Sequence, residues 1–358
     1  MASAVGQKHT AVARVPFQSK EEGDRVSRRA VQRMTEAFKE SEERQACMTL
    51  ASRADQRWLQ RAVQRGEVVR PHRGIYARTS YWNELDYRQK ALHVLKALAQ
   101  KHPDWVFAGT SAALVHGLEV GWADARRICV ASTVKTHPSF KGMCTRIIVT
   151  GDTPVERDGV RVTSFTRTLY DCLRSLQFPE GLAIADSALR VKGIDAVRLA
   201  HNVERSCANR PDLHRVLSVI SWADGRAENG GESKVRAHII LNGYALPELQ
   251  YKVDDSVDQG REYYVDFAWK LADGSLVFGE LDGKDKYTDP KMTGGLSAED
   301  VLLRERRREA RITIGDTPIR VMRFSFAEAC DTAYFTHLLD TYGIPRTEDG
   351  PISISQGL

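Results

Sequence analysis

Hydrophobic and polar positions alternate most clearly in the last third of this 358-residue chain. Residues 264–269 are rich in β-branched and aromatic side chains, Asp273-Gly274 supplies a tight turn, and residues 276–281 return, which predicts a β-hairpin. The pairing places Asp266 and Glu280 on otherwise apolar strands. Burying carboxylates is costly unless a positive group lies between them. The pattern therefore favours a divalent cation site, and two solvated carboxylates at the strand ends are the alternative.

Helical patterns flank this hairpin on both sides. In residues 230–244, Val235, Ile239 and Ile240 fall on one face of a predicted helix. After the hairpin, residues 298–315 are predicted to form another helix, which leads into a strand over residues 319–326. The predicted order in this part of the chain is therefore helix, hairpin, helix and strand.

This order resembles the PD-(D/E)XK nuclease superfamily over roughly residues 230–330. It looks more closely like the small bacterial endonuclease-like family related to the very-short-patch-repair (Vsr) endonucleases. That family carries an acidic residue in its first helix, an R-x-D-F type strand, an E-x-D-G strand end, an E-R-x-R type helix and a G-x-x-V-x-R strand. The matching positions here are Glu232 and residues 266–267, 280–283, 305–308 and 315–323.

The resemblance implies a Mg²⁺- or Mn²⁺-dependent endonuclease. The residues that it implies as catalytic are Glu232, Asp266, Glu280, Asp282, Lys284 and Lys286. Asp266, Glu280 and Asp282 would bind the metal, and Glu232 would hold a metal-bound water. The superfamily places a lysine two residues after the glutamate, where this chain has Asp282, so that role would pass to Lys284 or Lys286. A nuclease fold without activity is the alternative.

A second pattern occupies residues 44–80. Residues 45–53 and 54–65 are predicted as helices, and Trp58 and Leu59 mark the apolar face of the second. Gly66 ends that helix, and a strand, a turn and a second strand follow to Arg78. Two helices and a two-stranded wing indicate a winged helix-turn-helix.

The polar face of the second helix is rich in Arg and Gln, which read guanine and adenine edges in the major groove. Arginines on the wing would lie near phosphates. The residues predicted to contact double-stranded DNA are Arg53, Gln56, Arg57, Gln60, Arg61, Gln64, Arg70 and Arg73. A basic, solvated helix in a protein-binding domain is the alternative.

Residues 81–221 are predicted to form a mixed α/β middle domain. The segments RGIYAR, GTSAALVHGL, SFTRTLYDCLR and ADSALR resemble the AbiEi family of bacterial antitoxins, over roughly residues 45–215. The resemblance implies a winged helix that binds operator DNA, and a nucleotidyltransferase-like toxin as partner. Arg167 with Asp171, and Asp186 with Arg190, are four residues apart, and we interpret each pair as an i,i+4 ion pair or a buried structural contact, with a catalytic pair as the alternative.

Composition adds only broad limits. The formal net charge of +5 and the pI near 8.8 are compatible with nucleic acid but do not prove it. The six cysteines show no metal-binding or CxxC spacing, which indicates reduced thiols in the cytoplasm. No signal peptide and no run of about 18 apolar residues occurs, so we expect no membrane partner. No interface pattern indicates the oligomeric state.

The sequence thus predicts a multidomain α/β (α+β) protein. Its predicted parts are a polar arm (1–43), a winged helix (44–80), a middle domain (81–221), a nuclease-like domain (230–335) and a loose tail (340–358). The function that we expect is a DNA-binding protein with a metal-dependent endonuclease domain, in phage defence or a toxin–antitoxin context. The alternative is an AbiEi-like antitoxin or transcriptional regulator whose nuclease fold is inactive.

Overall fold

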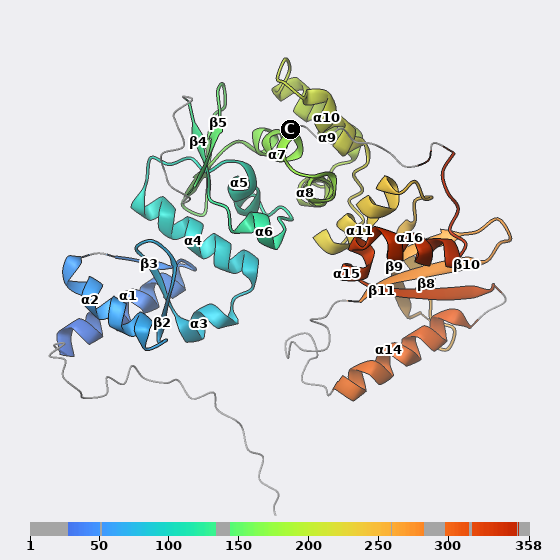
Figure 1. The fold of residues 1–358 in the computed structure, drawn as a ribbon, viewed down its shortest axis with the longest axis horizontal. Coiled ribbons are helices and arrows are strands. Elements are labelled where there is room, and N and C mark those ends of the chain that lie inside the picture. Colours follow the sequence, from blue (N-terminus) through green and yellow to red (C-terminus); the bar gives the residue numbers. More distant parts are fainter. Residues whose placement is uncertain are drawn as a thin grey trace, which may run out of the picture. The chain divides into compact units, whose positions relative to one another are not determined.

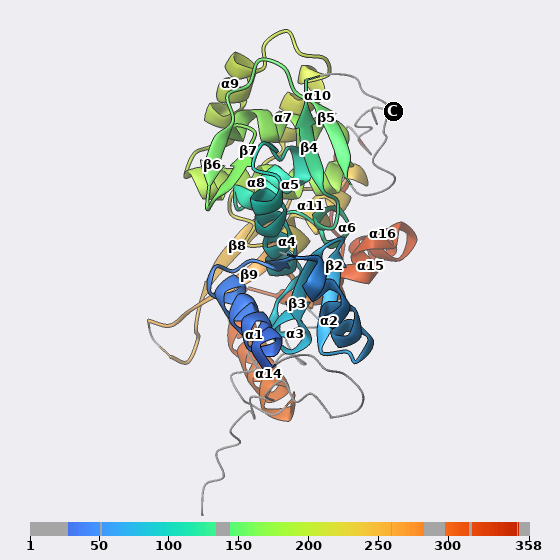
Figure 2. The same cartoon turned by 90° about the vertical axis from the view of Figure 1, so that its left-hand side faces the viewer.

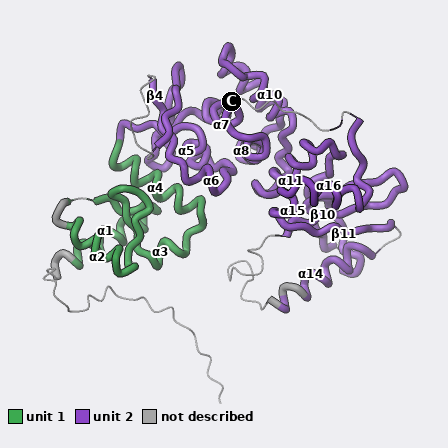
Figure 3. Tube along the Cα trace, in the orientation of Figure 1, with its two compact units in different colours: residues 1–102 green, residues 103–358 purple. Residues whose placement is uncertain are grey.

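The computed structural model describes residues 28–50, 52–133, 144–258, 260–282, 298–314, 317–348 and 350 (Figure 1). The chain divides into two compact units, Met1–His102 and Pro103–Leu358 (Figure 3). Both units contain helices, the first unit has one small sheet and the second has several, so the predicted multidomain α/β class is confirmed at this level. Among the helices of the described ranges, none is both long enough and apolar enough to cross a membrane.

The first unit is built on a small three-stranded sheet with helices packed against it. Its elements are α1 (Arg28–Glu43), β1 (Met48–Thr49), α2 (Arg53–Gln64), β2 (Val68–His72), β3 (Ile75–Arg78), α3 (Thr79–Glu84) and α4 (Tyr87–Lys101). The strand order is β1-β3-β2 and both pairings are antiparallel. Phe38, Trp58, Leu59 and Tyr76 belong to its hydrophobic core. The predicted second helix and two-stranded wing are therefore present.

Two predictions for this unit differ from the structure. Residues 28–43 were assigned to a polar arm, but they form α1, because Met34 and Phe38 bury their side chains against the sheet and α2. The helix predicted over residues 45–53 is wrong. There the chain forms β1, since Met48 pairs with Tyr76 of the wing and this tertiary pairing overrides the local helical pattern.

The first part of the second unit is a layer of strands covered by helices. Its elements are α5 (Gly109–Val115), α6 (Trp122–Ala125), β4 (Cys129–Ser132), β5 (Thr145–Ile148), β6 (Val155–Arg157), β7 (Val160–Val162), α7 (Phe165–Ser175), α8 (Phe178–Lys192), α9 (Ala196–Ser206) and α10 (Leu213–Ser221). Phe107 bridges β4 and β7, so the strands follow the order β5-β4-Phe107-β7-β6 (Figure 2).

The two predicted i,i+4 pairs have different outcomes. Arg167 and Asp171 are buried and lie 2.9 Å apart within α7, which confirms a structural pair. Asp186 is a buried structural residue, but the predicted pairing with Arg190 is wrong, because Asp186 pairs at 2.8 Å with Arg236 of α11 (Gly230–Leu241). This buried pair holds α11 against α8.

The C-terminal domain is a four-stranded sheet between two helical layers (Figure 1). Besides α11, its elements are β8 (Glu248–Asp254), β9 (Glu262–Lys270), β10 (Leu276–Asp282), α14 (Ala298–Thr313), β11 (Ile319–Ser325), α15 (Phe326–Cys330) and α16 (Thr332–Thr341). The strand order is β11-β10-β9-β8, with β10 and β11 parallel. One core cluster joins α11 and α16 to the sheet, and another lies under Ile312 of α14.

The predicted hairpin is confirmed as β9 and β10, and Gly274 in their turn has a φ of +83°. Strand β8 was not predicted. The chain predicted as a loose tail is partly ordered, since α16 ends at Thr341 and Thr347 then donates its backbone N–H to Gly243. The final stretch, residues 351–358, lies outside the described residues.

Candidate functional site

Four polar side chains form a single row across the C-terminal sheet, one from each strand. They are Gln250 of β8, Asp266 of β9, Glu280 of β10 and Arg323 of β11. In the strand register, Glu280 of β10 lies opposite Arg323 of β11. Asp266 and Glu280 lie one position beyond the register pair Phe267–Gly279 of β9 and β10. Gln250 and Asp266 lie at the level between two pairs of the β8–β9 ladder, Leu249–Phe267 and Tyr251–Val265. We name these four residues the polar row.

The adjacent row of the sheet is apolar throughout. It consists of Leu249, Phe267, Gly279 and Met322. Apart from its glycine, this row belongs to the buried core that faces α11 and α16. Polar groups therefore gather at one level of the sheet, as expected of a site rather than of a random distribution of surface charge.

Glu232 of α11 joins the polar row. Its side chain is buried, with 3% exposure, and its Oε2 accepts hydrogen bonds from the Glu228 backbone at 2.8 Å and from Gln250 Nε2 at 3.2 Å. Burial raises the pKa of the Glu232 carboxyl to about 7, and the negative charge of Asp266 adds to this shift. Glu232 is therefore poised to exchange a proton near neutral pH.

Gln250 is a site residue that the sequence analysis missed. Its φ of +51° is left-handed, a backbone conformation that costs a non-glycine residue about 1 kcal/mol or more. This conformation coincides with the skipped pair in β8, and the amide donates to Glu232. The only signal in the sequence was a lone amide between apolar neighbours in the strand-like run LQYKV.

Asp266 and Glu280, predicted as metal ligands, lie at neighbouring positions of β9 and β10, and each already accepts a hydrogen bond from another part of the domain. Asp266 Oδ2 accepts the backbone N–H of Leu281 at 2.9 Å, which fixes its carboxylate against β10. Glu280 is only 4% exposed, and both of its oxygens accept hydrogen bonds from Arg308 of α14, at 3.1 Å and 3.3 Å. A positive group thus does offset the buried glutamate, as the sequence pattern required, but it belongs to the chain itself.

Asp282 has a different partner. Arg323 contacts it at 2.8 Å and also approaches Glu305 and Glu309 of α14, each at 3.3 Å. The hydrogen bonds that Arg323 donates to Asp282 raise the pKa of Arg323 above its ordinary value. Alternating charges therefore link the end of β10 to α14. The predicted lysines, Lys284 and Lys286, lie outside the described residues.

The donor set fits a hard divalent cation in its chemistry. Within the described ranges, no three His, Cys, Asp or Glu side chains are grouped closely enough to hold a metal ion by themselves. Mg²⁺, however, is usually held by one or two carboxylates together with substrate phosphates. Asp266 and Glu280 offer two oxygen ligands at neighbouring strand positions, and the Arg308 guanidinium is the cation that now balances Glu280.

Most of the predicted DNA-contacting residues of the first unit are exposed. On α2, the exposed side chains are Gln56, Arg57, Gln60, Arg61 and Gln64. The opposite face of α2 buries Leu59 and Ala62 completely. Arg70 and Arg73 are exposed on the wing, and Arg53 is the first residue of α2. The amphipathic pattern thus placed the five exposed residues of α2 correctly on the helix, and DNA contact itself stays a prediction.

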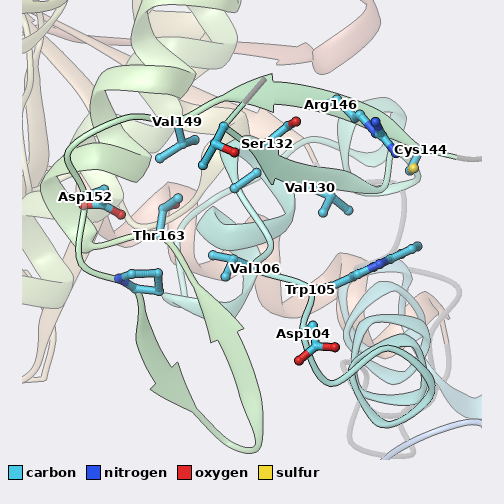
Figure 4. A pocket seen from close by; sticks show the side chains of 13 residues that line it. Asp104, Trp105, Val106, Val130, Ser132, Cys144, Arg146, Val149, Asp152 and Thr163 are labelled. Carbon is cyan, nitrogen blue, oxygen red and sulfur yellow. The ribbon is translucent and has the colours of Figure 1, made fainter. Parts of the chain in front are cut away.

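A separate pocket of about 450 Å³ opens over the strands of the middle region (Figure 4). Trp105, Val130 and Arg146 are among the residues around it. Asp152 lines it too, but its carboxylate accepts hydrogen bonds from Ser164, the N-cap of α7. Burial raises the pKa of the Cys144 thiol, which disfavours a thiolate nucleophile there. The lining does not indicate a catalytic centre.

Comparison with known proteins finds two curated relatives, from the H37Rv and CDC 1551 strains of Mycobacterium tuberculosis. Both are uncharacterised proteins, and each is 35% identical over 106 residues, which is 28% of this chain and 36% of the relative. The chain therefore spans about a third of the length of these relatives. No known protein family and no solved structure matches it. The AbiEi-like and Vsr-like resemblances stay predictions.

Proposed function

We propose that this protein binds duplex DNA through α2 and the β2–β3 wing, and that its C-terminal domain is a metal-dependent endonuclease. The observation that carries the enzymatic part is Glu232, a buried carboxyl with a pKa of about 7 that is hydrogen-bonded to the polar row. A shifted carboxyl beside two further carboxylates is typical of sites that move protons during catalysis.

Each residue of the site has a role in this proposal. Asp266 and Glu280 would hold Mg²⁺ or Mn²⁺, which would supply Lewis-acid stabilisation of charge on the scissile phosphate. The Leu281 backbone N–H orients the Asp266 carboxylate. Gln250 orients Glu232, which exchanges a proton with the reacting water or the leaving oxygen. Asp282, held by Arg323, keeps the end of β10 attached to α14.

A second function is supported by a specific observation. Both oxygens of Glu280 and both oxygens of Asp282 already accept hydrogen bonds from arginines of the same domain. If these pairs persist in the presence of a divalent cation, the nuclease-like domain is inactive. The protein would then be an AbiEi-like antitoxin or transcriptional regulator, with a nucleotidyltransferase-like toxin as its partner.

Plasmid cleavage by the purified full-length chain tests the proposal. With Mg²⁺ or Mn²⁺, we expect wild type to nick or linearise supercoiled DNA. Asp266→Ala or Glu280→Ala should lower the rate at least about 100-fold, since each removes a proposed ligand of the metal ion that would stabilise negative charge in the transition state. Asp254→Ala is the matched control, because Asp254 is an exposed carboxylate of the same sheet. If this control cleaves at the wild-type rate, then the loss of cleavage in the other two variants is specific to Asp266 and Glu280 and not a general effect of removing a carboxylate from the sheet.

The opposite result is equally definite. If wild type does not cleave under these conditions, while a salt-sensitive shift of duplex DNA survives in both alanine variants, then the endonuclease proposal is wrong. The regulator with an inactive nuclease fold then becomes the better description.

A further inference from the structure

A groove of about 470 Å³ lies beside the polar row and is lined mainly by arginines. The arginines that line it are Arg261, Arg304, Arg307, Arg308 and Arg311. Four of them follow the spacing i, i+3, i+4 and i+7 along α14, which places them on one face of the helix. The fifth comes from the segment that enters β9, so two separate parts of the domain contribute to the same groove.

The charges of this groove are only partly balanced. Arg311 pairs with Asp255 at 2.9 Å, and Arg308 pairs with Glu280 at 3.1 Å. Among the described residues, neither Arg304 nor Arg307 forms an ion pair, and both are exposed. Of the described residues that line the groove, Glu305 is the one acidic residue. The groove is thus strongly positive on the side where α14 meets solvent.

Arg308 connects the groove to the carboxylates. It lines the groove, and its guanidinium also contacts Glu280 of the polar row and the backbone oxygen of Tyr264, the latter at 2.6 Å. A polyanion lying in the groove would therefore run directly past Glu280. The planar guanidinium of arginine binds phosphate oxygens through two parallel hydrogen bonds, which suits it to a nucleic-acid backbone.

We infer that this groove binds the phosphate backbone of duplex DNA next to the bond to be hydrolysed. The inference rests on the proposed function, because it takes the polar row as the reaction site. It adds a second DNA contact to the chain, independent of α2 and the wing. Arg304 and Arg307 bind phosphates on the solvent side, and Arg308 marks the end of the groove nearest the carboxylates.

The test compares two double variants of the full-length chain that lose the same net charge. Arg304→Gln with Arg307→Gln removes two arginines of the groove. Arg306→Gln with Arg320→Gln removes two exposed arginines outside its lining, one on α14 and one on β11. Binding to a fluorescent duplex is followed by anisotropy over a series of salt concentrations, in EDTA so that no cleavage occurs, and thermal unfolding confirms that both variants are folded.

Each phosphate contact contributes about 0.9 to the slope of log affinity against log salt concentration. We expect the groove variant to reduce the slope by about 1.8, for two lost contacts, and the control variant to leave it close to wild type. Equal slopes in the two variants would overturn the inference. If the groove variant has a reduced slope but wild type never cleaves plasmid, the endonuclease proposal is rejected and DNA binding by the groove is retained. If wild type does not bind duplex DNA at all, both proposals are rejected.

Discussion

The two predicted nucleic-acid surfaces of this chain differ in how their charges are satisfied. On α2, Arg57 and its Gln neighbours are exposed, and the opposite face of the helix is anchored by its apolar residues and by the buried Asp55, which pairs with Arg33 of α1. In the C-terminal domain, the polar row is half-buried or buried, and Glu280 is held by Arg308. The first surface is available to an outside partner without any rearrangement. The second is already paired internally, so changes there must affect stability as well as any activity.

The largest effect that we expect from this difference concerns Glu232. Its folded-state pKa is about 7, against an ordinary value of 4.5. The folded state therefore holds the proton more tightly than the unfolded chain, and the stabilisation is fully present below pH 4.5 and is lost as the pH rises towards 7. At about 1.4 kcal/mol per pH unit, this loss is on the order of 3 kcal/mol.

Urea unfolding from pH 4.5 to 8 measures this effect. Wild type should lose stability over that range, and Glu232→Gln should remove most of the loss, because glutamine does not titrate. Glu248→Gln is the matched control, since Glu248 is an exposed carboxylate on β8. If both variants show the same pH dependence as wild type, then Glu232 is not a perturbed acid and the enzymatic proposal loses its main support.

We expect an effect of intermediate size on stability when one arginine is replaced in each of the two surfaces, Arg323 in the C-terminal domain and Arg57 on α2. Arg323 contacts Asp282, Glu305 and Glu309, so Arg323→Gln removes the cation that these three carboxylates share. Glu305 then keeps its longer contact with Arg308, at 3.8 Å. We expect a loss of about 1–3 kcal/mol in the free energy of unfolding of the second unit. Arg57→Gln on exposed α2 should change stability by no more than about 0.5 kcal/mol while weakening DNA binding.

Both variants are compared with wild type by urea unfolding and by duplex binding. Equal stability losses in the two would contradict the distinction between a solvent-facing surface and an internally paired one. A DNA affinity that Arg57→Gln leaves unchanged would instead argue that α2 is a solvated helix in a protein-binding domain, which was the alternative for this segment.

The elements that sequence reasoning predicted well are those defined by local periodicity. Helix α2, the wing and the β9–β10 hairpin follow directly from spacing and turn residues, and so does the exposure of Gln56 and Arg57. The prediction over residues 45–53 was wrong because pairing with Tyr76 decides the conformation there. A pairing partner almost thirty residues away leaves no trace in a local pattern.

The candidate site was predicted only in part for the same reason. Asp266 and Glu280 could be placed together because a short hairpin fixes their register. Gln250 and Arg308 could not, since they enter through an unpredicted strand and a helix that packs across the sheet. The pairing of Asp186 with Arg236 instead of Arg190 shows the same limit, because helix packing, and not sequence spacing, selects the partner of a buried charge.

The smallest effect concerns the backbone of Gln250, and it tests whether β8 is strained for the sake of the site. Its φ of +51° suits glycine better than any other residue, so Gln250→Gly should be more stable than Gln250→Ala by about 1 kcal/mol. Both variants lose the hydrogen bond to Glu232, which favours the charged carboxylate, so in both the pKa of Glu232 should rise further.

Urea unfolding at pH 8 compares the two variants, and the pH series used for Glu232 reports the pKa. Equal stability of the glycine and alanine variants would mean that the left-handed backbone carries no cost at this position. A glycine variant that is more stable than alanine, with the pH window of lost stability moved upwards in both, would show two separate contributions of Gln250. Its left-handed backbone lowers the free energy of unfolding. Its side-chain amide keeps the pKa of Glu232 near neutral, which suits a carboxyl that transfers protons.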